Sequence, residues 1–65
     1  MRISKSKIDI IMANRGLTQI KLAEIAKMSR TNLSIIINGK NCRPATITKI
    51  ATALNVDVTA IIEDA

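Results

Sequence analysis

The 65-residue sequence contains no Phe, Trp, Tyr or His, and it has one cysteine and one proline. Without aromatic rings there is no platform on which unpaired bases stack, which argues against a single-strand binder of that kind. A single cysteine excludes an internal disulfide, and one cysteine without histidine cannot build a metal cluster. We therefore expect no metal and no cofactor, and a core made of Ile, Leu, Val, Met and Ala.

Groups that carry enzymatic chemistry are also scarce. Cys42 has no histidine to serve as its base, and the five carboxylates are scattered without an acid–base spacing. The two glycines, Gly16 and Gly39, each look like a helix terminator, so no phosphate-binding glycine loop is predicted. An enzyme is therefore not expected. Arg43 beside Cys42 would lower the pKa of the thiol and allow it to sense oxidation, but an incidental loop cysteine is the favoured interpretation.

Long apolar runs are absent as well. No run approaches the roughly 20 residues that span a bilayer, and no signal-peptide pattern follows Met1. A chain of this length forms one domain at most, and its single cysteine suits a reducing compartment. We expect one domain over residues 1–65 that is soluble and cytoplasmic, with no membrane partner and no evident site for a small-molecule ligand.

What the sequence has in excess is positive charge. Ten Lys and Arg stand against five Asp and Glu, for a net charge of +5. Residues 1–49 hold all ten basic groups and two acidic ones, a net of +8, whereas residues 50–65 hold three acidic groups and no basic one, a net of −3. This polarity favours an anionic partner at one side, although ordinary surface scatter is the alternative and charge does not identify the partner.

Apolar spacing and capping residues predict an all-α chain of five short helices behind a flexible arm at residues 1–4. The first helix follows a cap at Ser4 or Ser6 and runs to about Arg15, and the others cover about 19–26, 30–37, 45–54 and 58–63. The predicted inward residues are Ile8, Ile11, Met12, Leu22, Ala23, Ala26, Leu33, Ile36, Ile47, Ile50, Ala51, Leu54, Ile61 and Ile62. Three isoleucines, Ile10, Ile20 and Ile25, fall outside these faces.

The second and third helices, over residues 19–39, are predicted to form a helix-turn-helix. Thr18 and Ser29 suit the two N-caps. The turn between the helices favours a left-handed residue, which is easiest for glycine, yet it holds Lys27. Lysine in this turn is therefore expected to cost stability relative to glycine.

The third helix presents a polar face that could read DNA. Arg30 suits guanine, Asn32 suits adenine, and Thr31 suits a base edge or a thymine methyl group. Ser34 and Ile35 lie on the same outer side. The remaining candidates for phosphate contacts are Gln19 at the positive end of the second helix, and Asn38, Lys40 and Arg43 in the loop. Each of these has an equally good non-binding interpretation taken singly (Arg30 solvated, Asn38 only a helix terminator), but together their spacing favours contact.

The chain resembles the phage-repressor and Cro-like (XRE-type) helix-turn-helix family of transcriptional regulators over about residues 8–62. The resemblance is most specific at Gly16-Leu17-Thr18-Gln19, Leu22-Ala23, Met28-Ser29-Arg30, Asn38-Gly39 with Pro44, and Ile50-Ala51 with Ala53-Leu54-Asn55-Val56. It implies a five-helix, lambda-repressor-like domain that binds operator DNA, usually as a two-fold dimer. By matching position it implies base contacts from Arg30 and Thr31, supported by Asn32, Ser34 and Ile35, and phosphate contacts from Gln19, Ser29, Asn38, Lys40 and Arg43.

Three positions depart from the family pattern. Lys27 replaces the usual turn glycine, and Ile35 replaces a residue that is frequently polar. Met12 and Ile37 stand where an Arg and a Glu often pair, and an apolar contact there avoids the desolvation cost of a buried ion pair.

The sequence thus predicts a double-stranded-DNA-binding regulator, a repressor, that inserts residues 30–37 in the major groove. We expect a homodimer, because one helix contacts too few bases for tight specificity, with Ile62 as a candidate for the dimer surface. The alternative is a protein-interaction module, such as an antitoxin, that uses the exposed Ile10, Ile20 and Ile25.

Overall fold

The computed structural model describes residues 1–63, and over that range the chain forms four α-helices and one short 3-10 helix. The α-helices are α1 (Lys5–Arg15), α2 (Gln19–Ala26), α3 (Arg30–Ile37) and α4 (Pro44–Leu54), and the 3-10 helix is Val58–Ala60. Residues 1–63 contain no strand beyond one isolated antiparallel bridge between Ile3 and Ile62. The all-α prediction is confirmed.

The helices begin where capping residues stand. The hydroxyl groups of Ser4, Thr18 and Ser29 each accept a hydrogen bond from the backbone N–H three residues later, at 3.3, 3.2 and 3.1 Å. Each bond satisfies an N–H that would otherwise lack a partner in the first turn, which stabilises the helix by about 1 kcal/mol. Pro44 begins α4, where no N–H donor is needed.

Three helices end on a residue in the left-handed conformation. Gly16 (φ 64°) ends α1, Lys27 (φ 57°) ends α2 and Asn55 (φ 57°) ends α4, and each N–H points back to carbonyl groups of its helix. The predicted left-handed turn at Lys27 therefore exists with lysine in place of glycine. A non-glycine residue in this conformation costs about 1 kcal/mol.

The core lies where the inner faces of the helices meet. α2 packs chiefly against α3 and α4, and its small residues Ala23 and Ala26 let the helices approach closely. Met12 and Ile37 are buried in this cluster, so an apolar pair occupies the place of the ion pair. The fully buried side chains are Ile3, Ile8, Leu22, Leu33, Ile37, Ile47, Ile50, Leu54 and Ile61.

The N-terminal segment differs from the flexible arm that the sequence predicted. Ile3 is 0% exposed and belongs to the core. The backbone N–H of Ser4 donates to the Ile61 carbonyl at 2.7 Å, and the N–H of Cys42 donates to the Met1 carbonyl at 2.8 Å. Buried apolar surface and backbone hydrogen bonds hold residues 1–4 in place.

The predicted fifth α-helix over 58–63 is not formed. Only Val58–Ala60 is helical, as a 3-10 turn that Asp57 caps through a 3.1 Å hydrogen bond to the Val58 N–H. The Ile61 carbonyl accepts from Ser4, and Ile62 pairs with Ile3, so the N-terminal segment uses the backbone groups that an α-helix would need. Ile62, the candidate for a dimer surface, is half-buried against the core.

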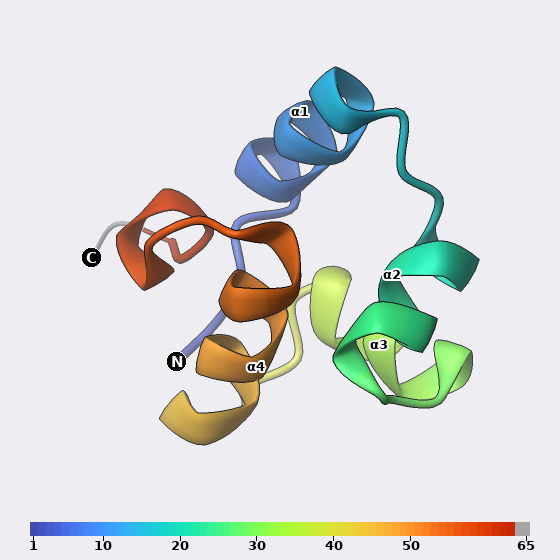
Figure 1. Cartoon of the computed structure of the whole chain (residues 1–65). Helices are drawn as coiled ribbons and strands as arrows, with labels where there is room; N and C mark the ends of the chain where they lie inside the picture. Colours follow the sequence, from blue (N-terminus) through green and yellow to red (C-terminus); the bar gives the residue numbers. More distant parts are fainter. Residues whose placement is uncertain (64–65) are drawn as a thin grey trace.

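Figure 1 shows α2 and α3 side by side at one side of the molecule, with α4 next to them, α1 across the top of the view and the segment of the 3-10 helix at the opposite edge. Because α3 packs inward through Leu33, Ile36 and Ile37, its other face is turned to solvent. This outer face is where the candidate site lies.

Candidate nucleic-acid interface

The outer face of α3 carries the residues predicted to contact bases. Arg30, Thr31 and Asn32 are exposed in its first turn, and Ile35 is 44% exposed one turn later. Ser34 is half-buried and lies at the edge of this face. Because Leu33, Ile36 and Ile37 fix the inner side of α3 in the core, the helical repeat turns Thr31 and Ile35 away from it and places Asn32 and Ser34 at the flanks. Arg30 falls on the stripe of Leu33 and Ile37 but is exposed as the first residue of the helix.

The start of α3 is fixed by Ser29. Its hydroxyl oxygen accepts from the Asn32 N–H at 3.1 Å, and Ser29 itself is exposed. A serine hydroxyl that accepts one hydrogen bond still has its own proton to donate. Ser29 can therefore cap the helix and donate to a phosphate oxygen at the same time.

Gln19 is the first residue of α2 and is half-buried. Thr18 caps the helix by accepting from the Lys21 N–H at 3.2 Å, which leaves the earlier N–H groups of this turn without an intrahelical partner. The Gln19 side chain forms no hydrogen bond with any of residues 1–63. Gln19 therefore lies at the positive end of a helix, in a turn whose first N–H groups have no intrahelical partner, a place suited to an anion.

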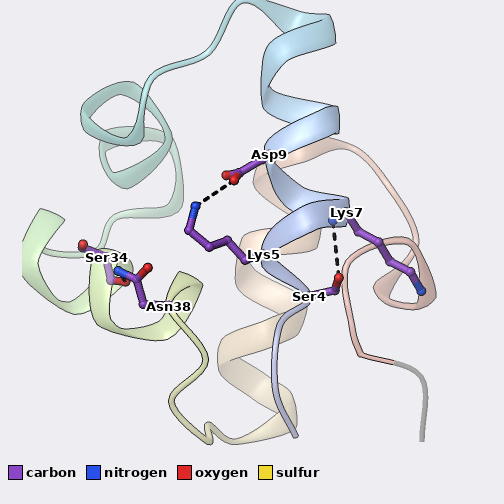
Figure 2. A network of polar contacts seen from close by, with 6 residues as sticks. All are labelled: Ser4, Lys5, Lys7, Asp9, Ser34 and Asn38. Carbon is purple, nitrogen blue, oxygen red and sulfur yellow. Dashed lines mark hydrogen bonds and ion pairs between the residues drawn. The ribbon is translucent and has the colours of Figure 1, made fainter.

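Asn38 follows α3 and closes the helix. Its side-chain amide donates to the Ser34 carbonyl at 2.9 Å, and its backbone N–H donates to the same carbonyl at 3.0 Å. Figure 2 shows the Asn38 side chain beside Ser34. One of the two amide hydrogens is used in this way and the other is free to reach outward. Asn38 therefore ends α3 and retains one amide hydrogen that it could donate to a phosphate.

A hollow of about 570 Å³ opens between the outer side of α3 and the start of α4. It brings together Ser29, Asn32 and Ile35 from the α3 side with Lys40 and Arg43 from the loop. The sequence predicted these five as DNA contacts, and the fold places them around one concave surface. Gln19, Arg30, Thr31, Ser34 and Asn38 do not line it.

Two lysines that sequence reasoning did not assign to the interface also line this hollow. They are Lys27 in the α2–α3 turn and Lys49 on the exposed side of α4. With Lys40 and Arg43 they make four basic groups around a lining that contains no acidic residue. The position of Lys49 between Ile47 and Ile50 in the helical repeat is a signal that its side chain is exposed. No local signal in the sequence places Lys49 near the turn between α2 and α3.

The acidic groups of the described chain lie elsewhere. Lys5 pairs with Asp9 on α1 at 2.8 Å (Figure 2), and Lys21 lies 3.7 Å from Glu24 on α2. Among residues 1–63, none of the four basic residues of the hollow forms an ion pair. The hollow therefore presents uncompensated positive charge beside α3.

Cys42 also lines the hollow and is half-buried. Burial raises the pKa of its thiol above the ordinary value, and the nearby N-terminal ammonium group opposes this to a lesser extent. This direction is opposite to the disfavoured alternative of a lowered thiol pKa: Arg43 follows Cys42 in sequence, but desolvation of the thiolate is the larger effect.

Within residues 1–63 there is no group of three or more His, Cys, Asp and Glu side chains positioned to hold a metal ion. The same part of the chain has no helix that combines the length and apolar character needed to cross a membrane.

Comparison with known proteins places this geometry in context. The family model for the Cro/C1-type helix-turn-helix DNA-binding domain matches residues 7–64. No curated protein shows a significant match. Similar solved structures include a hydroxyethylphosphonate dioxygenase variant, PhpD with cadmium and hydroethylphosphonate, and native PhpD with cadmium, with TM-scores of 0.84, 0.82 and 0.83. Each is 29% identical and matches all of this chain, which spans only 14% of its length.

Proposed function

The chain belongs to the family of Cro/C1-type helix-turn-helix DNA-binding domains, and we propose that it is a sequence-specific repressor that inserts α3 in the major groove. The observation that carries this proposal is the row of exposed Arg30, Thr31 and Asn32 at the capped start of α3. An α-helix with its side chains is about 10–12 Å in diameter, and the major groove of B-DNA is about 12 Å wide, so the groove admits α3.

The side chains on this helix suit the groove chemically. Arg30 presents the planar fork that pairs with O6 and N7 of guanine, and Asn32 presents the amide that pairs with N6 and N7 of adenine. Thr31 and Ile35 supply methyl groups for thymine, and Ser34 has a hydroxyl for a base edge. These five residues are the proposed base contacts.

The proposed backbone contacts flank this row. Gln19 and Ser29 stand at the starts of α2 and α3, where helix dipoles favour a phosphate. Lys40 and Arg43 line the basic hollow, and Asn38 has one amide hydrogen left to donate. Contacts of this kind set the register of the protein on DNA and make affinity depend on salt.

We propose that two copies bind each operator. One eight-residue helix reaches only a few base pairs, and specific sites normally need two such helices about one helical turn, roughly 34 Å, apart. Sedimentation of the chain with a selected duplex tests this proposal: two chains per duplex support it, and one chain per duplex overturns it. A cytoplasmic location stays a prediction.

A second candidate function is a protein-interaction module, such as an antitoxin. Ile10, Ile20 and Ile25 are 62%, 52% and 45% exposed, and the proposed DNA contacts include none of these three apolar side chains. In the hydroxyethylphosphonate dioxygenase structure this fold forms 14% of the chain, so it also occurs within larger proteins. For this chain we propose binding and not catalysis, because it has no histidine and its carboxylates are scattered.

Selection of duplexes from a random DNA pool tests the main proposal. The expected result is an enriched motif that the chain binds far more tightly than scrambled DNA at the same salt concentration. A pool that shows no enrichment, together with a small protein that co-purifies with the chain, would support the interaction module in its place.

A further inference from the structure

Lys27 occupies a backbone position that does not favour a side chain. It ends α2 with φ 57° and ψ 45°, and its N–H points to the carbonyls of Ala23 and Glu24. Glycine adopts this conformation without the steric cost that every other residue meets there. The Cβ atom of Lys27 therefore adds a cost at this turn, and the exposed lysine side chain can serve a role other than folding.

Lys27 borders two neighbouring hollows. Lys27 and Lys49 line the 570 Å³ hollow beside α3, and they also line a second hollow of about 360 Å³ between α2 and α4. The second hollow is otherwise walled by apolar and small residues, among them Ile25 and Ala53. The two lysines thus stand where the hollows meet, on elements that are far apart in the sequence.

The positive charge where the two hollows meet favours the binding of an anion. Lys27, Lys49, Lys40 and Arg43 share one concave surface, and no acidic side chain of residues 1–63 lines it or pairs with them. Like charges held close together repel each other and so oppose folding. An array of anions along the hollow would convert this repulsion into attraction, and a DNA strand carries such an array, with one phosphate per 3.4 Å of axis.

We propose that Lys27 and Lys49 bind phosphates of the DNA strand that passes the α2–α3 turn, so that the backbone contact continues from Lys40 and Arg43 across the hollow. This inference rests on the proposed function and adds two residues to its interface. α2 then contacts the backbone at both ends: Gln19 at its start, and Lys27 about 12 Å further along the helix. The recognition helix α3 follows Lys27 in the sequence, directly after the turn.

Lys27→Gly is the informative variant, because it separates folding from binding. Glycine suits the left-handed turn, so the denaturation midpoint is expected to rise or stay unchanged, while affinity for duplex DNA falls. Affinity varies as salt concentration to the power of about −0.9 for each phosphate contact, so one lost contact costs up to about eightfold at 0.1 M salt. Lys27→Asn tests the same loss of charge with a residue that also tolerates this conformation.

Lys49→Gln is expected to weaken binding in the same way, and the double variant Lys27→Gly/Lys49→Gln to lower the slope of log affinity against log salt by about two. Lys5→Gln is the matched control, since it removes one positive charge from α1 at a residue already paired with Asp9. Its salt slope should equal that of the wild type. Both random and selected duplexes should respond alike to the Lys27 and Lys49 changes, because phosphates carry no sequence.

The opposite pattern would overturn the inference. If Lys27→Gly lowers the denaturation midpoint and the double variant keeps the wild-type salt slope, Lys27 serves the helix end and not DNA. In that case a reduced slope for Lys40→Ala would leave the proposed function standing. If the wild-type chain binds no duplex at any salt concentration, the proposed function and this inference both fail.

Discussion

The Ser29 hydroxyl oxygen accepts a hydrogen bond from the Asn32 N–H at 3.1 Å, and this contact sets where α3 begins. It joins the residue before the helix to one of the proposed base contacts. The N-cap therefore does more than stabilise a helix end, because it fixes the first turn from which Arg30, Thr31 and Asn32 project. Ser29 therefore contributes to the stability of α3 and to the proposed DNA contact, and two substitutions can separate these two contributions.

Ser29→Ala removes the cap and the hydroxyl donor together. We expect the free energy of unfolding to fall by about 1 kcal/mol in urea titrations, and DNA affinity to fall as well. Ser29→Asp keeps a capping oxygen and adds a charge that the helix N-terminus favours, so stability should match or exceed that of the wild type. The same charge would repel a phosphate, and wild-type DNA affinity in Ser29→Asp would show that no phosphate lies there.

The N-terminal segment should contribute to stability through Ile3. Its side chain is 0% exposed in the core, so Ile3→Ala is expected to lower the free energy of unfolding by about 2–4 kcal/mol. Ile3→Val, which keeps the domain folded more readily, should cost about 1 kcal/mol. The exposed neighbour provides the control: Arg2→Ala should change stability by less than about 0.5 kcal/mol. An Ile3→Ala variant as stable as Arg2→Ala would contradict the ordered segment.

Cys42 should react slowly with alkylating reagents in the folded protein. Burial raises the pKa of its thiol, so less thiolate is present at neutral pH than in the unfolded chain. The sign for stability follows from the same shift. Below the pKa that the thiol has in the unfolded chain, its contribution to the stability of the fold is fully present. That contribution is lost as the pH rises through the pKa that the thiol has in the folded protein. Iodoacetamide labelling across pH, native against urea-unfolded, checks this, and faster labelling of the native protein would contradict it.

The helix boundaries could be predicted from the sequence because the signals that set them are local. Thr18 and Ser29 accept from N–H groups three residues away, and Gly16 and Asn55 end their helices by their own backbone conformation. The inner faces followed from the helical repeat of apolar residues for the same reason. Even the left-handed turn at Lys27 could be located, because the caps on both sides bracket it.

Features that depend on residues distant in sequence could not be predicted. The pairing of Ile3 with Ile62 holds the N-terminal segment in place and limits the last helix to a 3-10 turn. The meeting of Lys27 with Lys49 requires α4 to pack against α2, which no local pattern specifies. The direction of the Cys42 pKa shift could not be predicted for a related reason, since the burial of a loop side chain depends on the tertiary fold.

The base-reading role of α3 is the central claim, and Arg30→Ala compared with Lys40→Ala tests it most directly. Arg30→Ala should cost about 1–3 kcal/mol on the selected operator, little on random duplex, and relax preference at one base pair. Lys40→Ala should weaken both duplexes alike and lower the salt slope by about one. If the two variants lose affinity equally on operator and random DNA, α3 does not read the sequence and the account is wrong.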